Sequence, residues 1–354
     1  MGALFSFVVV ILLILVAYVG VAAAGLQSIF GIVIPYVAVL TFIVGVVYRV
    51  IKWGRSPVPF PIATTGGQQK SLPWIKQAKL DNPSSTTGVI GRMVLEVLLF
   101  RSLFRNTKSE LRDGKLGYGS AKWLWVAAIA FHWSFWIVLL RHIRLFATPV
   151  PSFVNVLENL DGFLQIGVPR LFLTGVILLL AVTYLLLRRF YVPQVRYISL
   201  ASDYFPLFLI MAIASTGILM RYFFRVDIVG VKELTMGLVS FNPVIPAGVG
   251  TIFYIHVFLV STLFIYFPFS KLMHMGGVFL SPTRNLANNS RMVRHANPWN
   301  YPVKVHTYDE YEEEFREKMI NAGIPIESTV LPEEFEEEFK EKVEDAGTPV
   351  REEE

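Results

Sequence analysis

The sequence contains no cysteine, and this absence excludes several kinds of protein chemistry. Structural disulfides, cysteine-ligated zinc and iron–sulfur clusters all need cysteine, so none of them can form within this chain. Covalently attached c-type haem is excluded as well, because its attachment needs a C-x-x-C-H segment.

Charged residues are also scarce. They make up 17% of the 354 residues, against about 25% in an average soluble domain. Hydrophobic residues make up 54%, and the mean hydropathy is +0.52. A helix needs about 20 residues to cross a hydrocarbon core of about 30 Å, and the backbone of a span must be bonded within its own segment. The sequence therefore predicts an all-α membrane protein with six transmembrane helices, over 4–24, 29–50, 121–146, 165–190, 203–224 and 247–279.

The charges that flank these runs predict how the chain is oriented. Residues 51–122 hold 12 Lys and Arg against 4 Asp and Glu, whereas 147–164 carry Glu158 and Asp161 and no Lys or Arg. By the positive-inside rule we expect a multi-pass protein of the cell membrane with both termini in the cytoplasm. The first run lacks a basic start and exceeds the usual signal-peptide core, so we expect it to remain as the first span.

Composition divides the chain into four parts. We expect two N-terminal spans (1–50), a basic cytoplasmic loop with an amphipathic helix (51–120), a four-span bundle (121–280) and an acidic cytoplasmic tail (281–354). The helix, near 89–110, either lies on the membrane surface or packs against the bundle. The basic residues flank spans, where orientation explains them, so nucleic acid is not an expected partner.

The tail carries 9 Lys and Arg against 18 Asp and Glu. It contains two similar segments, each with aromatic residues in an acidic helical pattern and an Ala-Gly end that would cap a helix. They are YDEYEEEFREKMINAG, from Tyr308, and LPEEFEEEFKEKVEDAG, from Leu331. The tail is either a solvated, partly disordered segment or a docking element for a cytoplasmic partner.

Four of the six histidines lie within predicted spans, where ionisable residues are costly and usually functional. His132 and His142 lie on the third span, and His256 and His274 on the last. Separations of 10 and 18 residues correspond to about 15 Å and about 27 Å along a helix. Because these two spans are antiparallel, His132 matches His274 in depth toward the cytoplasm, and His142 matches His256 toward the outside.

Paired imidazoles at two depths predict a diheme core. Two imidazoles per iron give a six-coordinate centre that transfers electrons and does not activate oxygen. The 10 residues from His132 to His142 turn the helix about 80° less than three whole turns, so these two histidines point to adjacent faces of their helix. Helix crossing or a kink at Pro268 must compensate for this rotation if both pairs are to form. The alternatives are Met273 or Met275 as a ligand, and a transporter or proton-relay protein without haem.

Haem propionates and quinones need polar partners near the interfaces. The candidates outside are Arg141, Arg144 and Arg221, with Arg225, and the candidate inside is Lys271, with Lys122 and Arg189. Ordinary interfacial anchoring of these side chains by snorkelling is the alternative.

The segments FHWSFWIVLLRH (131–142) and HVFLVSTLFIYFPFSKLMH (256–274) resemble the membrane cytochrome b of respiratory nitrate reductase, its gamma subunit (NarI). The resemblance covers about residues 29–280. It implies that His132, His142, His256 and His274 are the axial ligands of two haem b groups.

The extra N-terminal span, the basic loop and the acidic tail depart from that subunit and resemble the DsrM branch of the family, the cytochrome b of heterodisulfide-reductase-like menaquinol oxidoreductase. This branch implies menaquinol as electron donor and a cytoplasmic iron–sulfur partner related to the heterodisulfide reductase catalytic subunit. It also implies a disulfide- or trisulfide-type thiol acceptor in sulfur or sulfite respiration, with further membrane and extracytoplasmic redox subunits possible.

Overall fold

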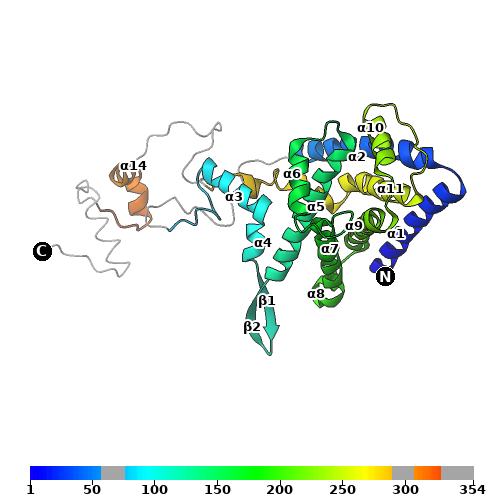
Figure 1. Cartoon of the computed structure of the whole chain (residues 1–354). Coiled ribbons are helices and arrows are strands. Elements are labelled where there is room, and N and C mark those ends of the chain that lie inside the picture. The colour runs from blue at the N-terminus through cyan, green and yellow to red at the C-terminus, as the bar shows by residue number, and fades with distance from the viewer. Residues whose placement is uncertain (57–75, 289–306, 328–354) are drawn as a thin grey trace. The chain divides into compact units, whose positions relative to one another are not determined.

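The structure is a computed structural model that describes residues 1–56, 76–288 and 307–327 (Figure 1). It divides into two compact units, Met1–Met292 and Val293–Glu354. Within the described residues the chain is mostly helical, with six helices long and apolar enough to cross a membrane.

The six spans lie close to the predicted runs. They are α1 (Gly2–Tyr18) continued by the π-helical turn η1 (Val19–Ala23), η2 (Ile29–Val33) with α2 (Ile34–Gly54), α5 (Lys122–Phe146), α7 (Leu173–Tyr191), α9 (Ala201–Ile218) with the π-helical turn η3 (Leu219–Phe224), and α11 (Thr251–Tyr266) with the 3-10 turn η4 (Phe267–Phe269). The membrane architecture predicted from composition is confirmed at this level.

Two predicted spans are longer than the observed ones. The fourth was expected from 165 but α7 begins at Leu173, because Gln165 and Gly167 have φ values of +50° and +78° that no α-helix contains. The last was expected to continue to 279 but ends at Phe269. Pro268 interrupts the backbone ladder, and the Ser270 side chain accepts a hydrogen bond from the Leu272 N–H (3.1 Å) that starts a new turn.

From this break to residue 288 the chain forms short elements only. They are the 3-10 turn η5 (Lys271–Met273), α12 (His274–Gly277) and α13 (Pro282–Asn285). His274 therefore lies on a separate segment beyond the last span, which corrects the expectation of one continuous helix from 247 to 279.

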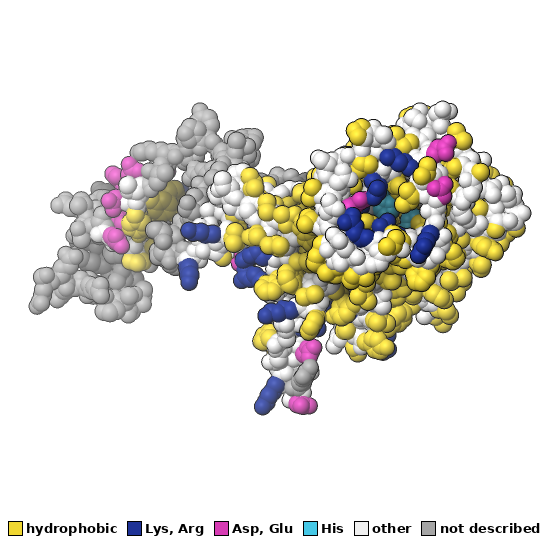
Figure 2. All heavy atoms as spheres, in the orientation of Figure 1, with side chains coloured by type: hydrophobic (Ala, Val, Ile, Leu, Met, Phe, Trp, Pro, Cys, Tyr) yellow, Lys and Arg dark blue, Asp and Glu magenta, His cyan; other side chains and the backbone are white. Residues whose placement is uncertain are grey.

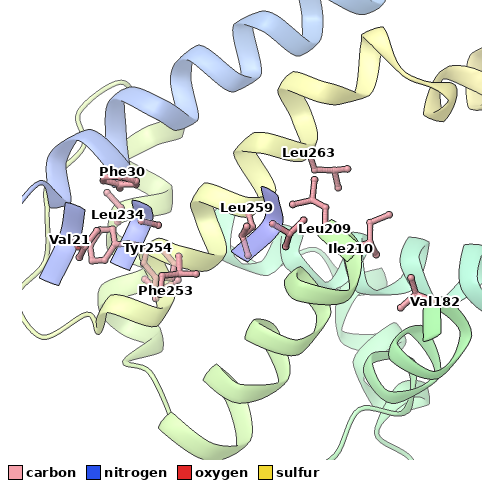
Figure 3. Packing of buried hydrophobic residues seen from close by; sticks show 14 residues of the cluster. Val21, Phe30, Val182, Leu209, Ile210, Leu234, Phe253, Tyr254, Leu259 and Leu263 are labelled. Atoms are coloured by element: carbon pink, nitrogen blue, oxygen red, sulfur yellow. The ribbon is translucent and has the colours of Figure 1, made fainter. Parts of the chain in front are cut away.

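α11 is the central helix of the bundle. It packs against α1, α2 and α9, whereas α5 packs against α7. Figure 3 shows the buried core side chains lying along α11 and its neighbours, with Tyr254, Leu259 and Leu263 from α11 itself. At Gly45 of α2 a Cβ atom would lie 2.7 Å from Pro268 Cβ, so glycine there allows α2 to approach the turn after α11.

Short helices cover the two ends of the bundle. α6 (Ser152–Asp161) and α10 (Ile228–Val239) lie at one end in Figure 1, and α8 (Pro193–Ile198) lies at the opposite end. The Thr235 hydroxyl donates to the Leu145 carbonyl (2.6 Å) and fastens α10 to α5.

The structure contains a β-hairpin at the end of the bundle where α8 lies (Figure 1). This hairpin was not predicted from the sequence. β1 (Thr107–Arg112) pairs antiparallel with β2 (Lys115–Ser120) through a turn in which Asp113 and Gly114 both have positive φ. Asp-Gly is the preferred pair for such a two-residue turn. The fold is therefore mostly helical with one hairpin, and not purely all-α.

The expected amphipathic helix is two helices, α3 (Thr86–Leu99) and α4 (Arg101–Arg105), separated by Phe100 at φ +49°. Two tryptophans of α5 hold the end of α3: Trp125 Nε1 donates to the Leu99 carbonyl (2.7 Å) and Trp133 Nε1 to the Leu98 carbonyl (3.0 Å). The end of α3 and α4 thus contact α5, and a position of α3 on the membrane surface stays a prediction.

α3 also binds the chain that follows the last span. Buried Arg92 donates to the carbonyls of Asp81 (3.2 Å), Leu286 (3.0 Å) and Arg284. The Asn288 N–H donates to the Pro83 carbonyl (2.6 Å). We call residues 77–105 with 281–288 the inner module.

In the second unit, the first acidic segment is helix α14 (Tyr308–Asn321), which begins with a capping box between Thr307 and Glu310. It ends at Ala322, followed by Gly323 at φ +67°, as the Ala-Gly pattern predicted. The second acidic segment, from Leu331, lies outside the described residues.

Replacing Arg92 by leucine should loosen the inner module. Hydrogen bonds from a charged donor contribute about 1.5–3 kcal/mol, and Arg92 is buried where water cannot replace it. We expect faster amide hydrogen exchange in residues 281–288 and faster proteolysis there. Arg105→Leu is the control, because Arg105 is half exposed and shares Asp81 with Arg101. Equal exchange rates in both variants would contradict this role of Arg92.

Candidate functional site

The inner histidine pair joins α5 to the segment beyond the last span. The ring centres of His132 and His274 lie 5.9 Å apart, with their planes 81° from parallel. Phe100 and Phe131 pack edge-on against His132, with centre distances of 4.9 and 5.1 Å. The pair therefore sits between the bundle and the inner module.

The outer pair joins α5 to α11. The imidazoles of His142 and His256 are close enough to interact electrostatically. His256 also contacts α9, since the Thr216 hydroxyl lies 2.9 Å from its Nδ1 and a Cβ atom on Gly217 would lie 3.4 Å from its Cε1. The structure thus places His132 beside His274 and His142 within electrostatic reach of His256, and their role as paired haem ligands stays a prediction.

All four imidazoles have one ring nitrogen occupied. Nδ1 lies 2.7 Å from the Ala128 carbonyl in His132 and 2.7 Å from the Val138 carbonyl in His142. In His274, Nδ1 lies 2.9 Å from the Lys271 carbonyl. A carbonyl only accepts, so these three nitrogens carry the proton and leave the Nε2 lone pair for a metal.

The helices that bear the histidines leave space between them. Among the described residues, α5 packs against α4, α6, α7 and α10, and α11 packs against α1, α2 and α9, whereas α5 and α11 are not closely packed on each other. His142 is exposed although it lies on a helix that packs against four others, as expected for a side chain in the wall of a cleft. Figure 2 shows histidine side chains at the bottom of a hollow whose rim carries Lys and Arg.

These residues fit haem better than a bare metal ion. The described residues contain no group of three or more His, Cys, Asp or Glu that could hold a metal by themselves. Each pair offers two nitrogens, and a porphyrin supplies the other four of a six-coordinate iron. A metal–imidazole bond is about 2 Å and the nitrogen lies about 1 Å from the ring centre, so two axial rings have centres about 6 Å apart. The inner pair has this spacing.

A cluster of arginines lies at the outer end. The guanidinium carbons of Arg141 and Arg221 stand 3.8 and 4.0 Å from the centre of the Phe172 ring. Arg141 Nε lies 3.1 Å from Asp161 Oδ2, an ion pair that is not aligned as a hydrogen bond. Asp161 accepts two more bonds, from the Thr174 N–H (2.7 Å) and hydroxyl (2.6 Å). Two cations thus lie against one ring, and Arg141 is the one that pairs with Asp161.

The other predicted polar partners are already paired. Arg144 Nη1 lies 2.7 Å from both carboxylate oxygens of Glu158, and Lys271 Nζ lies 2.7 Å from Asp203 Oδ1. The buried Nε atoms of Arg141 and Arg221 have no hydrogen-bond partner in the described part of the chain. Arg221, which forms no ion pair among the described residues, is therefore better placed than Arg144 or Lys271 to bind an anion, and Arg141 lies beside it on the same ring.

Sequence reasoning missed three residues of this site. Thr216 and Phe100 contact histidines from other helices, and no local pattern marks such contacts. Arg49 of α2 has a buried Nε without a partner among the described residues, and Trp53 lies beside it and beside the chain after His274. A lone arginine inside a predicted span was the available signal for Arg49.

Comparisons with known proteins agree on one family. The family described as nitrate reductase gamma subunit matches residues 97–296. A protein of Archaeoglobus fulgidus named Hdr-like menaquinol oxidoreductase cytochrome b-like subunit is 46% identical over 278 residues, which is 77% of this chain and 83% of the relative. A protein of Archaeoglobus profundus with the same name is 42% identical over 273 residues, 75% of this chain and 81% of the relative.

Asp161→Asn should destabilise the outer end strongly, because it leaves Arg141 buried without its counter-charge. Breaking a buried ion pair from one side costs about 3–5 kcal/mol. Glu158→Gln is the control: its partner Arg144 is 42% exposed, and we expect a cost below about 1 kcal/mol. Thermal unfolding of the purified protein in detergent measures both. The ranking of the two ion pairs is wrong if Glu158→Gln lowers Tm as much as Asp161→Asn.

Proposed function

This chain belongs to the nitrate reductase gamma subunit family, with relatives named Hdr-like menaquinol oxidoreductase cytochrome b-like subunit, and on that premise we propose that it is a diheme cytochrome b that oxidises menaquinol. Membership makes it a membrane subunit of the quinol oxidoreductase type. The number of haems, their ligands, the path of the electrons and the partner are the proposed parts.

The observation that carries this proposal is the pairing of four imidazoles whose Nδ1 atoms are already bonded. His132 with His274 would hold one haem b, and His142 with His256 the other. Haem ligated in this way supplies one-electron transfer, because both axial positions are filled and no position remains for oxygen.

The arginine cluster is the proposed carboxylate site of the outer haem. A cation removed from water needs an anionic partner, and in the described part of the chain Arg141 pairs with Asp161 whereas half-buried Arg221 forms no ion pair. Their guanidinium groups would bind the propionates and fix the orientation of the macrocycle. Arg49, with its buried free Nε, is the corresponding candidate at the inner end, in preference to Lys271.

We place the His142/His256 end outside and the His132/His274 end toward the cytoplasm. Applied to the 12 Lys and Arg of the 51–122 sequence, the positive-inside rule predicts that both termini lie in the cytoplasm of a cell-membrane protein. Oxidation of one menaquinol near the outer pair yields menaquinone, two protons released outside and two electrons that pass inward.

The electron acceptor is proposed to be a cytoplasmic iron–sulfur subunit related to the heterodisulfide reductase catalytic subunit, in sulfur or sulfite respiration. The "Hdr-like" name of the relatives supports such an assembly. The chain itself has no cysteine for a cluster, so the cluster must belong to a partner. The basic loop and the acidic tail offer that partner surfaces of both signs.

Histidine substitutions test the haem assignment. The purified protein should be red, with two haem b per chain in a pyridine-haemochrome assay. His142→Ala and His256→Ala should each remove the same haem and abolish menaquinol oxidation, and His132→Ala and His274→Ala should each remove the other. His295→Ala and His306→Ala, in the tail, are controls that should keep both haems. A colourless wild-type protein would instead favour the proton-relay alternative, and retention of both haems in His142→Ala would refute the pairing.

Arg221→Gln tests the carboxylate site. Removing a cation next to a propionate should favour the ferric form and lower the midpoint potential of one haem. A charge-assisted hydrogen bond of about 1.5–3 kcal/mol sets the scale of the change. Arg144→Gln is the matched control, since Glu158 already neutralises Arg144. Equal potentials in wild type and Arg221→Gln would remove Arg221 from the site.

A further inference from the structure

His256 differs from the other three histidines in what binds its Nδ1. The others bond to a backbone carbonyl of their own segment, three or four residues earlier in the chain. His256 bonds instead across to another helix, α9, where the Thr216 hydroxyl lies 2.9 Å from its Nδ1 and the Ile213 carbonyl is a second acceptor nearby. The orientation of this one imidazole therefore depends on the packing of α9 against α11.

The direction of this hydrogen bond follows from the other bonds of the hydroxyl. Thr216 Oγ1 lies 2.8 Å from the Ala212 carbonyl and 3.0 Å from the Ile213 carbonyl, and both can only accept. A hydroxyl has one proton, so that proton goes to a carbonyl and the oxygen accepts from His256 Nδ1–H. The His256 ring is thereby held in the tautomer whose Nε2 lone pair is free.

The backbone next to Thr216 restricts the ring further. Gly217 lies directly beside His256, where a Cβ atom would be 3.4 Å from Cε1, in ordinary contact. Thr216 is itself buried, with 9% of its surface exposed, so water does not compete for the bond. The ring thus has a hydroxyl at Nδ1 and a helix backbone against one edge.

We propose that Thr216 is a positioning residue for His256, which fixes the tautomer and the rotation of this imidazole and so tunes the outer haem alone. This rests on the proposed function. An acceptor on Nδ1–H raises the basicity of the ligating nitrogen and stabilises ferric iron. Thr216 therefore keeps the potential of the outer haem lower than an unbonded imidazole would allow. The inner haem, whose histidines bond to backbone, is independent of Thr216.

Thr216→Val tests this, because valine keeps the shape of threonine and removes the hydroxyl. We expect the midpoint potential of one haem to rise, with the ferric-to-ferrous equilibrium changing by about tenfold, which is about 59 mV for a one-electron couple. The low-spin ferric EPR signal of that haem should shift as its ring rotates. The other haem should keep both its potential and its signal.

Two further variants separate the hydroxyl from general packing. Thr216→Ser keeps the hydroxyl and should restore the wild-type potential. Thr262→Val removes a threonine hydroxyl from α11 itself, where it bonds only to the Phe258 carbonyl (2.8 Å), and should change neither haem.

The outcomes distinguish this inference from the proposed function. Two haems in the wild type with an unchanged potential and EPR signal in Thr216→Val would overturn the role of Thr216 and leave the diheme assignment standing. A shift of the same size in Thr262→Val would also overturn it, as would a shift confined to the haem lost in His132→Ala. A wild type without haem would overturn both.

Discussion

The site depends on the occupied Nδ1 atom of each of the four histidines. An imidazole within an apolar bundle carries a polar N–H that has no water to bond, and His132, His142 and His256 each place it on a nearby acceptor, as His274 does beyond the last span. This satisfies the buried donor and at the same time selects which nitrogen is free. Neutral, oriented Nε2 atoms are what a metal ligand needs, so the constraint that the bilayer imposes also prepares the ligands.

The two ends of the bundle surround their histidine pairs differently. The inner pair is enclosed by aromatic side chains, with Phe100 and Phe131 packed edge-on against His132. The outer pair lies beneath charged groups, where Arg141 and Arg221 face Phe172 and Asp161. An apolar surrounding disfavours the added charge of ferric iron, whereas nearby arginines favour bound carboxylates, so the two ends offer unequal electrostatic environments.

Much of this architecture could be predicted from the sequence, because the signals that carry it are local. Long apolar runs locate the six spans, and the spacing of His132, His142, His256 and His274 pairs them by depth. The helix that was expected to reach residue 279 shows where prediction from local signals ends. Pro268 indicated a kink, but the new turn that Ser270 caps depends on a side-chain hydrogen bond that hydrophobic periodicity does not reveal. The hairpin was not predicted although Asp113-Gly114 is a turn signal, because its second strand is exposed throughout and lacks the alternation of a half-buried strand. Thr216 could not be found at all, since its significance comes from the packing of α9 on α11.

The break after Phe269 has a mechanical consequence. Two 3-10 turns precede His274, and the chain that follows it is hydrogen-bonded to Arg92 of α3. The position of His274 therefore depends on the inner module as much as on the bundle. His132, its partner across the pair, is anchored in the rigid middle of α5. One histidine of the inner pair is therefore held by a long helix of the bundle, and the other by short turns and by the hydrogen bonds of the inner module.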